Sequence, residues 1–140
     1  MKTLYLISVF IHIICACIWL GGMFSLIIFF IPLRKEHYFL DMINKVGNQF
    51  KFVGWIILPL LLLTGIFNSI YRGFYILTWL KIFLFSIIVI ISAIHDFYIG
   101  PKAVRQGDKR LIRYSRIIGR INFILAIIMV LLGVFIVRGF

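Results

Sequence analysis

The sequence predicts an all-α integral membrane protein that folds as one bundle of four transmembrane helices. Of its 140 residues, 64% are hydrophobic and 14% are charged, whereas soluble domains carry about 45–50% apolar and about 25% charged residues. The mean hydropathy is +1.14. These values exclude a water-soluble enzyme. Three histidines, two cysteines and four acidic residues are also too few for a disulfide scaffold or a Cys-rich zinc module.

Four apolar runs define the expected helices. A bilayer core needs about 20 apolar residues in helical form, and only helices or closed barrels satisfy their backbone polar groups in lipid. We expect helices at about residues 4–31, 52–71, 76–99 and 117–137. These helices occupy most of the chain, so we expect residues 1–140 to form a single transmembrane domain.

Individual residues within these runs and at their ends indicate where the helices end or bend. The first run resembles a secretory signal around Ala16-Cys17, but it continues to Ile31, far beyond the length of a signal sequence, so we expect a retained helix. The second contains Pro59, which would free a backbone carbonyl. The third reaches Gly100-Pro101, where we expect the helix to break before a basic segment that leads into the fourth helix.

The basic residues are distributed asymmetrically between the loops. Residues 34–51 contain four Lys or Arg and residues 102–120 contain seven, while four remain for the other side. By the positive-inside rule, both basic loops face the cytoplasm and both termini face outward. The net charge of +11 is therefore typical of a prokaryotic inner-membrane protein that meets anionic lipid. We do not expect nucleic acid as a partner.

Ionisable residues inside the membrane are the main candidates for function, because each costs about 2.5–3.5 kcal/mol or more at the helix centre. The first helix contains His12. At about 100° per residue, the unusual side chains of this helix share its face: Tyr5, Ser8, Cys15, Trp19 and Met23. A buried histidine that hydrogen bonds a neighbouring helix is the simpler interpretation. The adjacent Gly21-Gly22 would let a second helix or a flat ligand approach the backbone.

The third helix contributes Lys81 and His95. Counted from the outer ends of their helices, His12 and Lys81 lie at similar depth, whereas His95 lies about 21 Å deeper than Lys81, level with Met23. Axial ligands of one porphyrin must meet its iron at nearly the same point, so His12 pairs better with Lys81 than with His95. The alternatives are that Lys81 extends its amine to the headgroups and that His95 forms an interfacial hydrogen-bonded pair with Asp96.

A copper interpretation uses a different set of side chains. Cys15 and Cys17 point about 200° apart, so they neither bond to each other nor bind one metal together, and a buried free cysteine is usually a small apolar residue. Imidazole and soft sulfur donors nevertheless suit copper. The candidate copper ligands are His12, Cys15, Met23 and His95. Since His12 and Met23 are about 16 Å apart along the helix, copper would need successive sites.

Four short motifs lie along the predicted helices: residues 12–24 (HIICACIWLGGMF), 59–65 (PLLLLTG), 79–81 (WLK) and 93–101 (AIHDFYIGP). These motifs resemble the CopD-type copper resistance membrane domain and the related HemJ family of protoporphyrinogen oxidases. The resemblance implies that His12 and Lys81 match the two residues proposed as haem ligands in HemJ proteins. HemJ proteins carry Asn-Glu-x-Pro at the start of the last helix, whereas here Asn122 is followed by Phe-Ile-Leu.

Three functions follow from these observations. The first is a membrane redox protein with one b-type haem held by His12 and Lys81, with Trp19 and His95 as further cofactor contacts, which passes electrons to a quinone or oxidises a porphyrinogen. The second is copper transport or tolerance. The third is an accessory membrane subunit without a cofactor. The expected partners are membrane lipid, a quinone or porphyrin, and a second copy of the chain.

Overall fold

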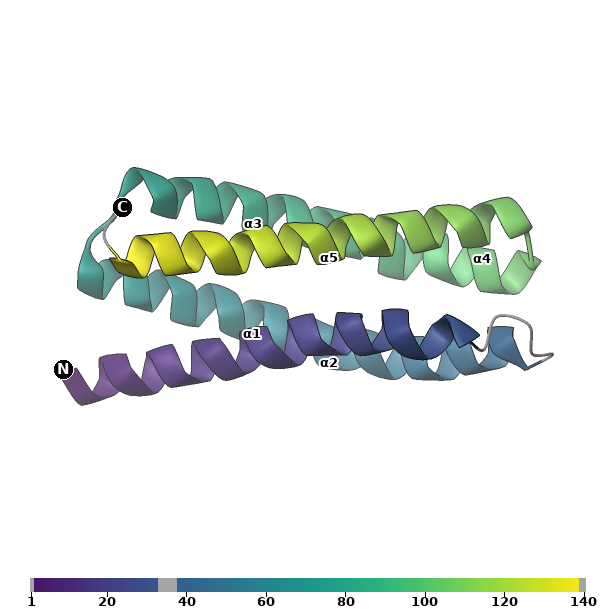
Figure 1. Ribbon diagram of the computed structural model, residues 1–140, viewed down its shortest axis with the longest axis horizontal. Coiled ribbons are helices and arrows are strands. Elements are labelled where there is room, and N and C mark those ends of the chain that lie inside the picture. Colours follow the sequence, from purple (N-terminus) through teal and green to yellow (C-terminus); the bar gives the residue numbers. More distant parts are fainter. Residues whose placement is uncertain (1, 33–37, 139–140) are drawn as a thin grey trace.

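The computed structural model describes residues 2–32 and 38–138, and these residues fold almost entirely into helices (Figure 1). The long helices are α1 (Lys2–Phe30), α2 (Phe39–Arg72), α3 (Ile76–Ile94) and α5 (Lys109–Arg138). A π-helical turn, η2 (His95–Ile99), and a short helix, α4 (Gly100–Gln106), extend α3. No strand occurs in the described residues. The predicted all-α class is confirmed.

Within the described residues, four continuous helical stretches are long and apolar enough to cross a membrane: Lys2–Phe30, Asp41–Arg72, Ile76–Gln106 and Lys109–Arg138. The chain is therefore a multi-pass membrane protein with four spanning helices, as predicted. This agreement rests on the length and composition of the helices, which set whether a helix can span the hydrocarbon core.

Two of the predicted helix starts were wrong. The second helix begins at Phe39 rather than near residue 52, and the last begins at Lys109 rather than near residue 117. Hydropathy detects only the part of a helix that suits lipid, whereas backbone hydrogen bonding continues into the polar flanks. Asp108 starts α5 by accepting a hydrogen bond from the Arg110 backbone N–H through Oδ1 at 2.8 Å.

The predicted break at Gly100-Pro101 was also wrong, because the helix continues through these residues after a wider, π-helical turn. The Gly100 N–H donates to the carbonyl of His95, five residues earlier, which is the π-helical pattern. Pro101 then occupies the first turn of α4, where its missing N–H is tolerated. The helix ends only at Gly107, whose φ of 60° is the left-handed conformation that glycine adopts readily.

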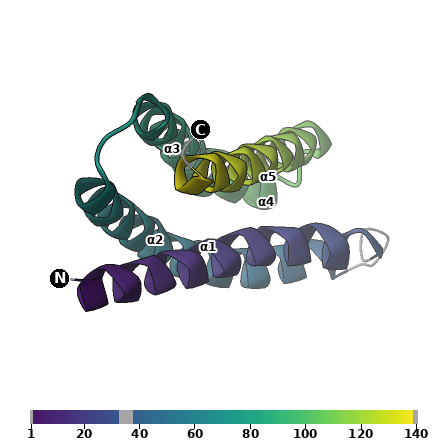
Figure 2. The same ribbon diagram turned by 60° about the vertical axis from the view of Figure 1, so that its left-hand side comes forward.

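The helices form two antiparallel pairs, α1 with α2 and α3 with α5 (Figures 1 and 2). The two pairs contact each other mainly through α1 and α5. Both ends of the described chain lie at one end of the bundle together with the α2–α3 connection, while α4 and the start of α5 lie at the other (Figure 1). An even number of crossings brings both ends of the chain to the same side of the membrane, as the predicted topology requires. Arg34 and Lys35, which contribute to the predicted sidedness, lie outside the described residues.

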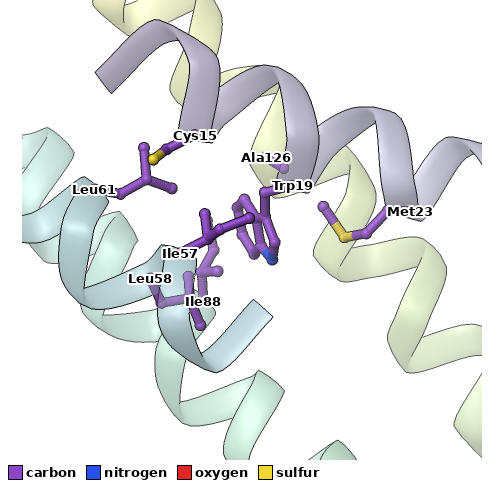
Figure 3. Close-up of a cluster of buried hydrophobic side chains, with 8 residues drawn as sticks. All are labelled: Cys15, Trp19, Met23, Ile57, Leu58, Leu61, Ile88 and Ala126. Carbon is purple, nitrogen blue, oxygen red and sulfur yellow. The ribbon is translucent and has the colours of Figure 1, made fainter. Parts of the chain in front are cut away.

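The core lies at the middle of the bundle, where the two pairs meet (Figure 3). Ile88 of α3 is fully buried, and Ala126 of α5 is 2% exposed, because a small side chain there lets neighbouring helices approach closely. The cluster as a whole contains Cys15, Trp19, Met23, Ile57, Leu58, Leu61, Ile88 and Ala126. Most other large apolar side chains are exposed, as expected for a protein surrounded by lipid.

Gly22 shows how closely α1 and α2 pack. A Cβ atom placed on Gly22 would collide with the Phe50 ring, whereas one on Gly21 would meet nothing within 4 Å. The close approach that the Gly21-Gly22 pair predicted is therefore made at Gly22, and the aromatic side chain of α2 occupies it.

Candidate functional site

One large cavity lies at the end of the bundle that holds the termini, and we call it the outer cavity. Its volume is about 590 Å³, within the range of about 300–1,000 Å³ that is usual for small-molecule sites. All four long helices contribute to its walls, which are mainly apolar. Its charged and strongly polar lining residues are His12, Asn68, Arg72, Lys81 and Arg138. The structure thus brings His12 of α1 and Lys81 of α3 to the same cavity.

The imidazole of His12 is oriented by Thr64 of α2. Its Nδ1 lies 2.8 Å from the Thr64 hydroxyl oxygen, and that hydroxyl donates its own proton to the Leu60 carbonyl at 2.6 Å. Because the hydroxyl proton is already used, the oxygen accepts from Nδ1–H. In the neutral ring this assignment leaves the lone pair on Nε2, the nitrogen that a metal would bind. Such outer-shell bonds fix the tautomer and direction of a ligating histidine.

Two glycines lie against these side chains. A Cβ atom on Gly65 would lie 3.4 Å from Cε1 of His12, an ordinary van der Waals contact, so the ring lies against α2 at this residue. A Cβ atom on Gly133 would lie 3.1 Å from Nζ of Lys81. Among the described residues no carboxylate lies within ion-pair distance of Lys81. Its amine is therefore held beside the backbone of α5 without a carboxylate partner from this part of the chain.

A second cavity, the inner cavity, lies toward the end of the bundle that holds α4. Its volume is about 410 Å³, and both Met23 and His95 line it. Trp19, which is 7% exposed, lines the outer and the inner cavity alike and so forms part of the wall between them. Of the expected cofactor contacts, Trp19 accompanies His12 and Lys81, whereas His95 belongs to the other cavity.

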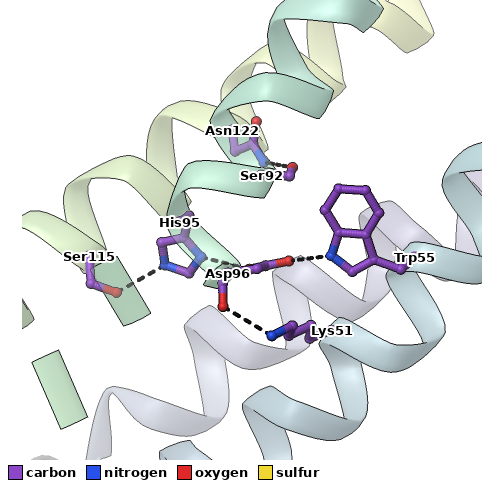
Figure 4. A network of polar contacts seen from close by, with 7 residues as sticks. All are labelled: Lys51, Trp55, Ser92, His95, Asp96, Ser115 and Asn122. Carbon is purple, nitrogen blue, oxygen red and sulfur yellow. Dashed lines mark hydrogen bonds and ion pairs between the residues drawn. The ribbon is translucent and has the colours of Figure 1, made fainter. Parts of the chain in front are cut away.

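His95 takes part in a polar network centred on Asp96 (Figure 4). Asp96 Oδ1 lies 2.9 Å from His95 Nδ1, and Asp96 Oδ2 accepts from Trp55 Nε1 at 3.1 Å. His95 Nε2 lies 2.9 Å from the hydroxyl oxygen of Ser115 on α5. Lys51 Nζ donates to the backbone carbonyl of Asp96 at 3.1 Å. The His95–Asp96 hydrogen-bonded pair expected as an alternative to a cofactor contact is present, and it is part of a larger network.

The geometry of η2 explains why Lys51 can bind the Asp96 carbonyl. In an α-helix the Gly100 N–H would bond this carbonyl, but here it bonds His95 instead. In the π-helical pattern the donor to the Asp96 carbonyl would come from residue 101, five residues later, but Pro101 has no N–H. The Asp96 carbonyl is therefore left without a donor from its own helix, and the Lys51 ammonium supplies one from α2.

The proposed copper ligands are spread over three environments. His12 lines the outer cavity, Cys15 is buried in the core, and Met23 and His95 line the inner cavity. In residues 2–32 and 38–138, no three His, Cys, Asp or Glu side chains gather in a way that could hold a metal ion. Copper binding stays a prediction from the sequence.

Sequence reasoning missed the residues that complete both cavities. Thr64 and Gly133 were not connected with His12 and Lys81, although a hydroxyl and a glycine inside a lipid-facing helix are signals for a close interhelical contact. Ser115 gave no such signal, because it lies in a helix flank outside the apolar run, and Trp55 lies inside an apolar run, where an aromatic residue does not by itself indicate a polar partner.

Comparison with known proteins finds a relative that matches the whole chain. An uncharacterized protein of Aquifex aeolicus (strain VF5) is 33% identical over 145 aligned residues, which cover 100% of this chain and 98% of the relative. No family model matches the sequence, and no solved structure matches it.

Proposed function

We propose that this protein, which belongs to the same family as the uncharacterized Aquifex aeolicus protein, is a membrane redox protein that binds one b-type haem in its outer cavity. In this proposal His12 and Lys81 are the axial ligands. The observation that carries it is that these two side chains, from different helices, line the same large cavity inside the membrane span. The resemblance of residues 12–24 and 79–81 to CopD-type and HemJ proteins supports the same assignment.

The surroundings of His12 fit a haem ligand. The Thr64 hydroxyl holds Nδ1 and leaves Nε2 with its lone pair, which is the state that metal ligation requires. The ring lies against Gly65, so packing restricts its position as well. The ring is thus held through Nδ1 and against Gly65, and in this proposal the iron would be bound through Nε2.

The charges of the outer cavity fit a ligand that carries carboxylates. Arg72 and Arg138 line its wall close to the ends of α2 and α5, and no Asp or Glu is among its described lining residues. Haem b has an apolar ring with carboxylate substituents at one edge. The apolar interior would bury the ring while the two arginines meet the carboxylates near the membrane surface.

When bound, haem b supplies one-electron redox chemistry whose potential depends on the axial ligands and on burial. The chain's contribution is to fix the two ligand side chains, to exclude water with apolar walls, and to separate the outer from the inner cavity with Trp19. We place electron transfer to a quinone before porphyrinogen oxidation, because residues 122–125 lack the acid and the proline of the HemJ motif.

The direct test is an absorption spectrum of the protein purified in mild detergent, recorded after addition of haem, with and without dithionite. We expect a Soret band that shifts on reduction. The band should be lost or shifted in His12→Ala and Lys81→Met. Matched controls are Ile11→Ala, which removes an exposed side chain from the same helix as His12, and Lys45→Met, which removes an exposed lysine elsewhere. No Soret band in the wild type, or equal bands in all variants, would reject the proposal.

A second measurement separates the two redox outcomes. The haem-loaded protein would be given a reduced quinol or protoporphyrinogen, and its reduction would be followed at the Soret band. Reduction by the quinol alone would support quinone-linked electron transfer, and production of protoporphyrin would support the oxidase.

We further propose that the membrane is the prokaryotic cytoplasmic membrane and that the termini face outward. The exposed basic residues at the α4 end support this orientation through the positive-inside rule: Lys102, Arg105, Lys109, Arg110 and Arg113. A reporter fused to either terminus tests it, because an enzyme that is active only outside the cytoplasm should be active at both positions.

A further inference from the structure

The inner cavity contains three side chains in the arrangement of a hydrolytic triad (Figure 4). Asp96 Oδ1 lies 2.9 Å from His95 Nδ1, and His95 Nε2 lies 2.9 Å from Ser115 Oγ. Triads are recognised by this sequence of contacts, from carboxylate to Nδ1 and from Nε2 to the hydroxyl, rather than by the order of residues in the chain. The proposed haem site uses none of the three.

The protons of this network have one consistent assignment. An ionised carboxylate can only accept hydrogen bonds, so Nδ1 of His95 carries the proton that Asp96 accepts. In the neutral ring Nε2 then holds a lone pair and accepts from the Ser115 hydroxyl. This is the state in which a histidine can take the proton of a serine as the serine attacks.

Ser115 differs from four other hydroxyl residues inside the helices. Ser25, Thr64, Ser69 and Ser86 each donate to the backbone carbonyl four residues earlier, which is the usual position of such a side chain in a helix. The recorded bond of the Ser115 side chain goes to His95 Nε2 instead. The hydroxyl is therefore directed at the base rather than at its own helix.

The carboxylate of the triad is held from a third helix. Trp55 of α2 donates to Asp96 Oδ2, and Lys51 of the same helix donates to the Asp96 backbone carbonyl. Both oxygens of the carboxylate thus have a donor, and the backbone behind it is fixed through the carbonyl that η2 leaves free. Asp96 is a positioning residue, because it acts on the reaction through His95.

The triad is accessible from the inner cavity. The side chains of His95 and Asp96 are 29% and 22% exposed, and Ser115 lines the same cavity. The remaining walls include Met23, Ile27, Phe30 and Phe39, which suit a hydrocarbon chain.

The charge of the inner cavity indicates the kind of head group it would accept. Three basic side chains line the cavity, Lys51, Arg116 and Arg120, against the single described carboxylate of Asp96. An excess of positive charge attracts anionic head groups.

We propose that the inner cavity is a second active site, in which Ser115 is the nucleophile and His95 the base for hydrolysis of long-chain acyl esters of membrane lipids. Ser115 Oγ bonds to the ester carbonyl carbon while its proton passes to His95 Nε2. The bond from that carbon to the alcohol oxygen breaks, and the alcohol leaves with the proton. Water then attacks the acyl-serine, giving its proton back through His95 to Ser115 and releasing the fatty acid.

The first test is covalent labelling of the full-length protein in detergent micelles with a long-chain alkyl fluorophosphonate. The serine oxygen displaces fluoride from phosphorus, and mass spectrometry locates the adduct. We expect the adduct on Ser115 and none in Ser115→Ala. His95→Ala should label at least about 100-fold more slowly, since a general base contributes about 10²–10⁴-fold. Ser86→Ala, which changes an exposed serine bonded to its own helix, is the matched control and should label like the wild type.

Two further measurements exclude a purely structural role for the network. Free imidazole should restore part of the labelling rate in His95→Ala, since it replaces the missing base and not the missing packing. Asp96→Glu should retain more labelling than Asp96→Asn, because only the former keeps the carboxylate. Circular dichroism of each variant reports whether the helices are intact.

The substrate class is tested with a phospholipid that releases a fluorescent fatty acid. The wild type should release it and Ser115→Ala should not. No adduct on Ser115, equal labelling of His95→Ala and the wild type, or an adduct without any release of fatty acid would overturn the proposal. Folded His95→Ala that imidazole fails to rescue would equally count against His95 as the base.

Discussion

The Thr64 hydroxyl oxygen lies 2.8 Å from Nδ1 of His12, and the same hydroxyl donates a hydrogen bond to the Leu60 carbonyl. This relationship decides which nitrogen of His12 is free. Thr64→Val keeps the shape of the side chain but removes the acceptor, so we expect the dissociation constant for haem to rise about 10–100-fold, as is usual when an outer-shell partner is lost. Titration of the Soret band measures it. Thr64→Ser restores the hydroxyl and should bind like the wild type, and an unchanged affinity in Thr64→Val would contradict the assignment.

The contact between Gly133 and Lys81 gives a test of the second ligand. A Cβ atom on Gly133 would lie 3.1 Å from Nζ of Lys81, so Gly133→Val should push the amine away from its place. We expect a shifted Soret band while haem remains bound through His12. The same change at Gly21, where a Cβ atom would meet nothing within 4 Å, is the control. Identical spectra for both variants would argue against Lys81 as a ligand.

The two arginines at the outer cavity predict how the ligand is oriented. If Arg72 and Arg138 bind its carboxylates, replacing both with Gln should weaken haem binding by about two- to five-fold per arginine, the size expected for exposed charge pairs. The dimethyl ester of haem, which has no carboxylate, should bind both proteins equally. The same replacements at Arg105 and Arg110, exposed at the opposite end, should change neither affinity. Equal loss for haem and its ester would refute this orientation.

The interaction of Lys51 with the Asp96 carbonyl predicts a coupling with Pro101. Lys51→Met leaves this carbonyl without its donor and should lower the free energy of unfolding by about 1–3 kcal/mol. Pro101→Ala introduces an N–H in the π register, so it should reduce the cost of Lys51→Met in the double variant. Unfolding in a denaturing detergent measures all four proteins of this cycle. Strict additivity would show that the proline is not the reason why the carbonyl is free.

The fold could be predicted from sequence because lipid imposes a local requirement. A run such as the one that ends at Ile31 must be helical wherever it crosses hydrocarbon, since no water is present to bond its backbone. The same reasoning fails at Phe39, Lys109 and Gly100. These residues lie in polar flanks or at a proline, where hydrogen bonds to Asp108 and across η2 decide whether the helix continues.

The candidate site was only partly predictable. The depth of His12 and Lys81 follows from counting residues along two helices, and the structure brings both side chains to one cavity. Their immediate neighbours Thr64 and Gly133 could not be derived in this way, because the count fixes height and leaves open which faces of two helices meet.

The sequence by itself determined four membrane-spanning helices, their basic end, and the small set of ionisable residues inside them. Only the tertiary structure decided that Trp19 stands between two cavities, with His12 in one and His95 in the other. The physical reason is that composition and length control whether a helix spans the bilayer, whereas its rotation and crossing depend on packing between helices. That packing is set by contacts such as Phe50 against Gly22 and the burial of Ala126.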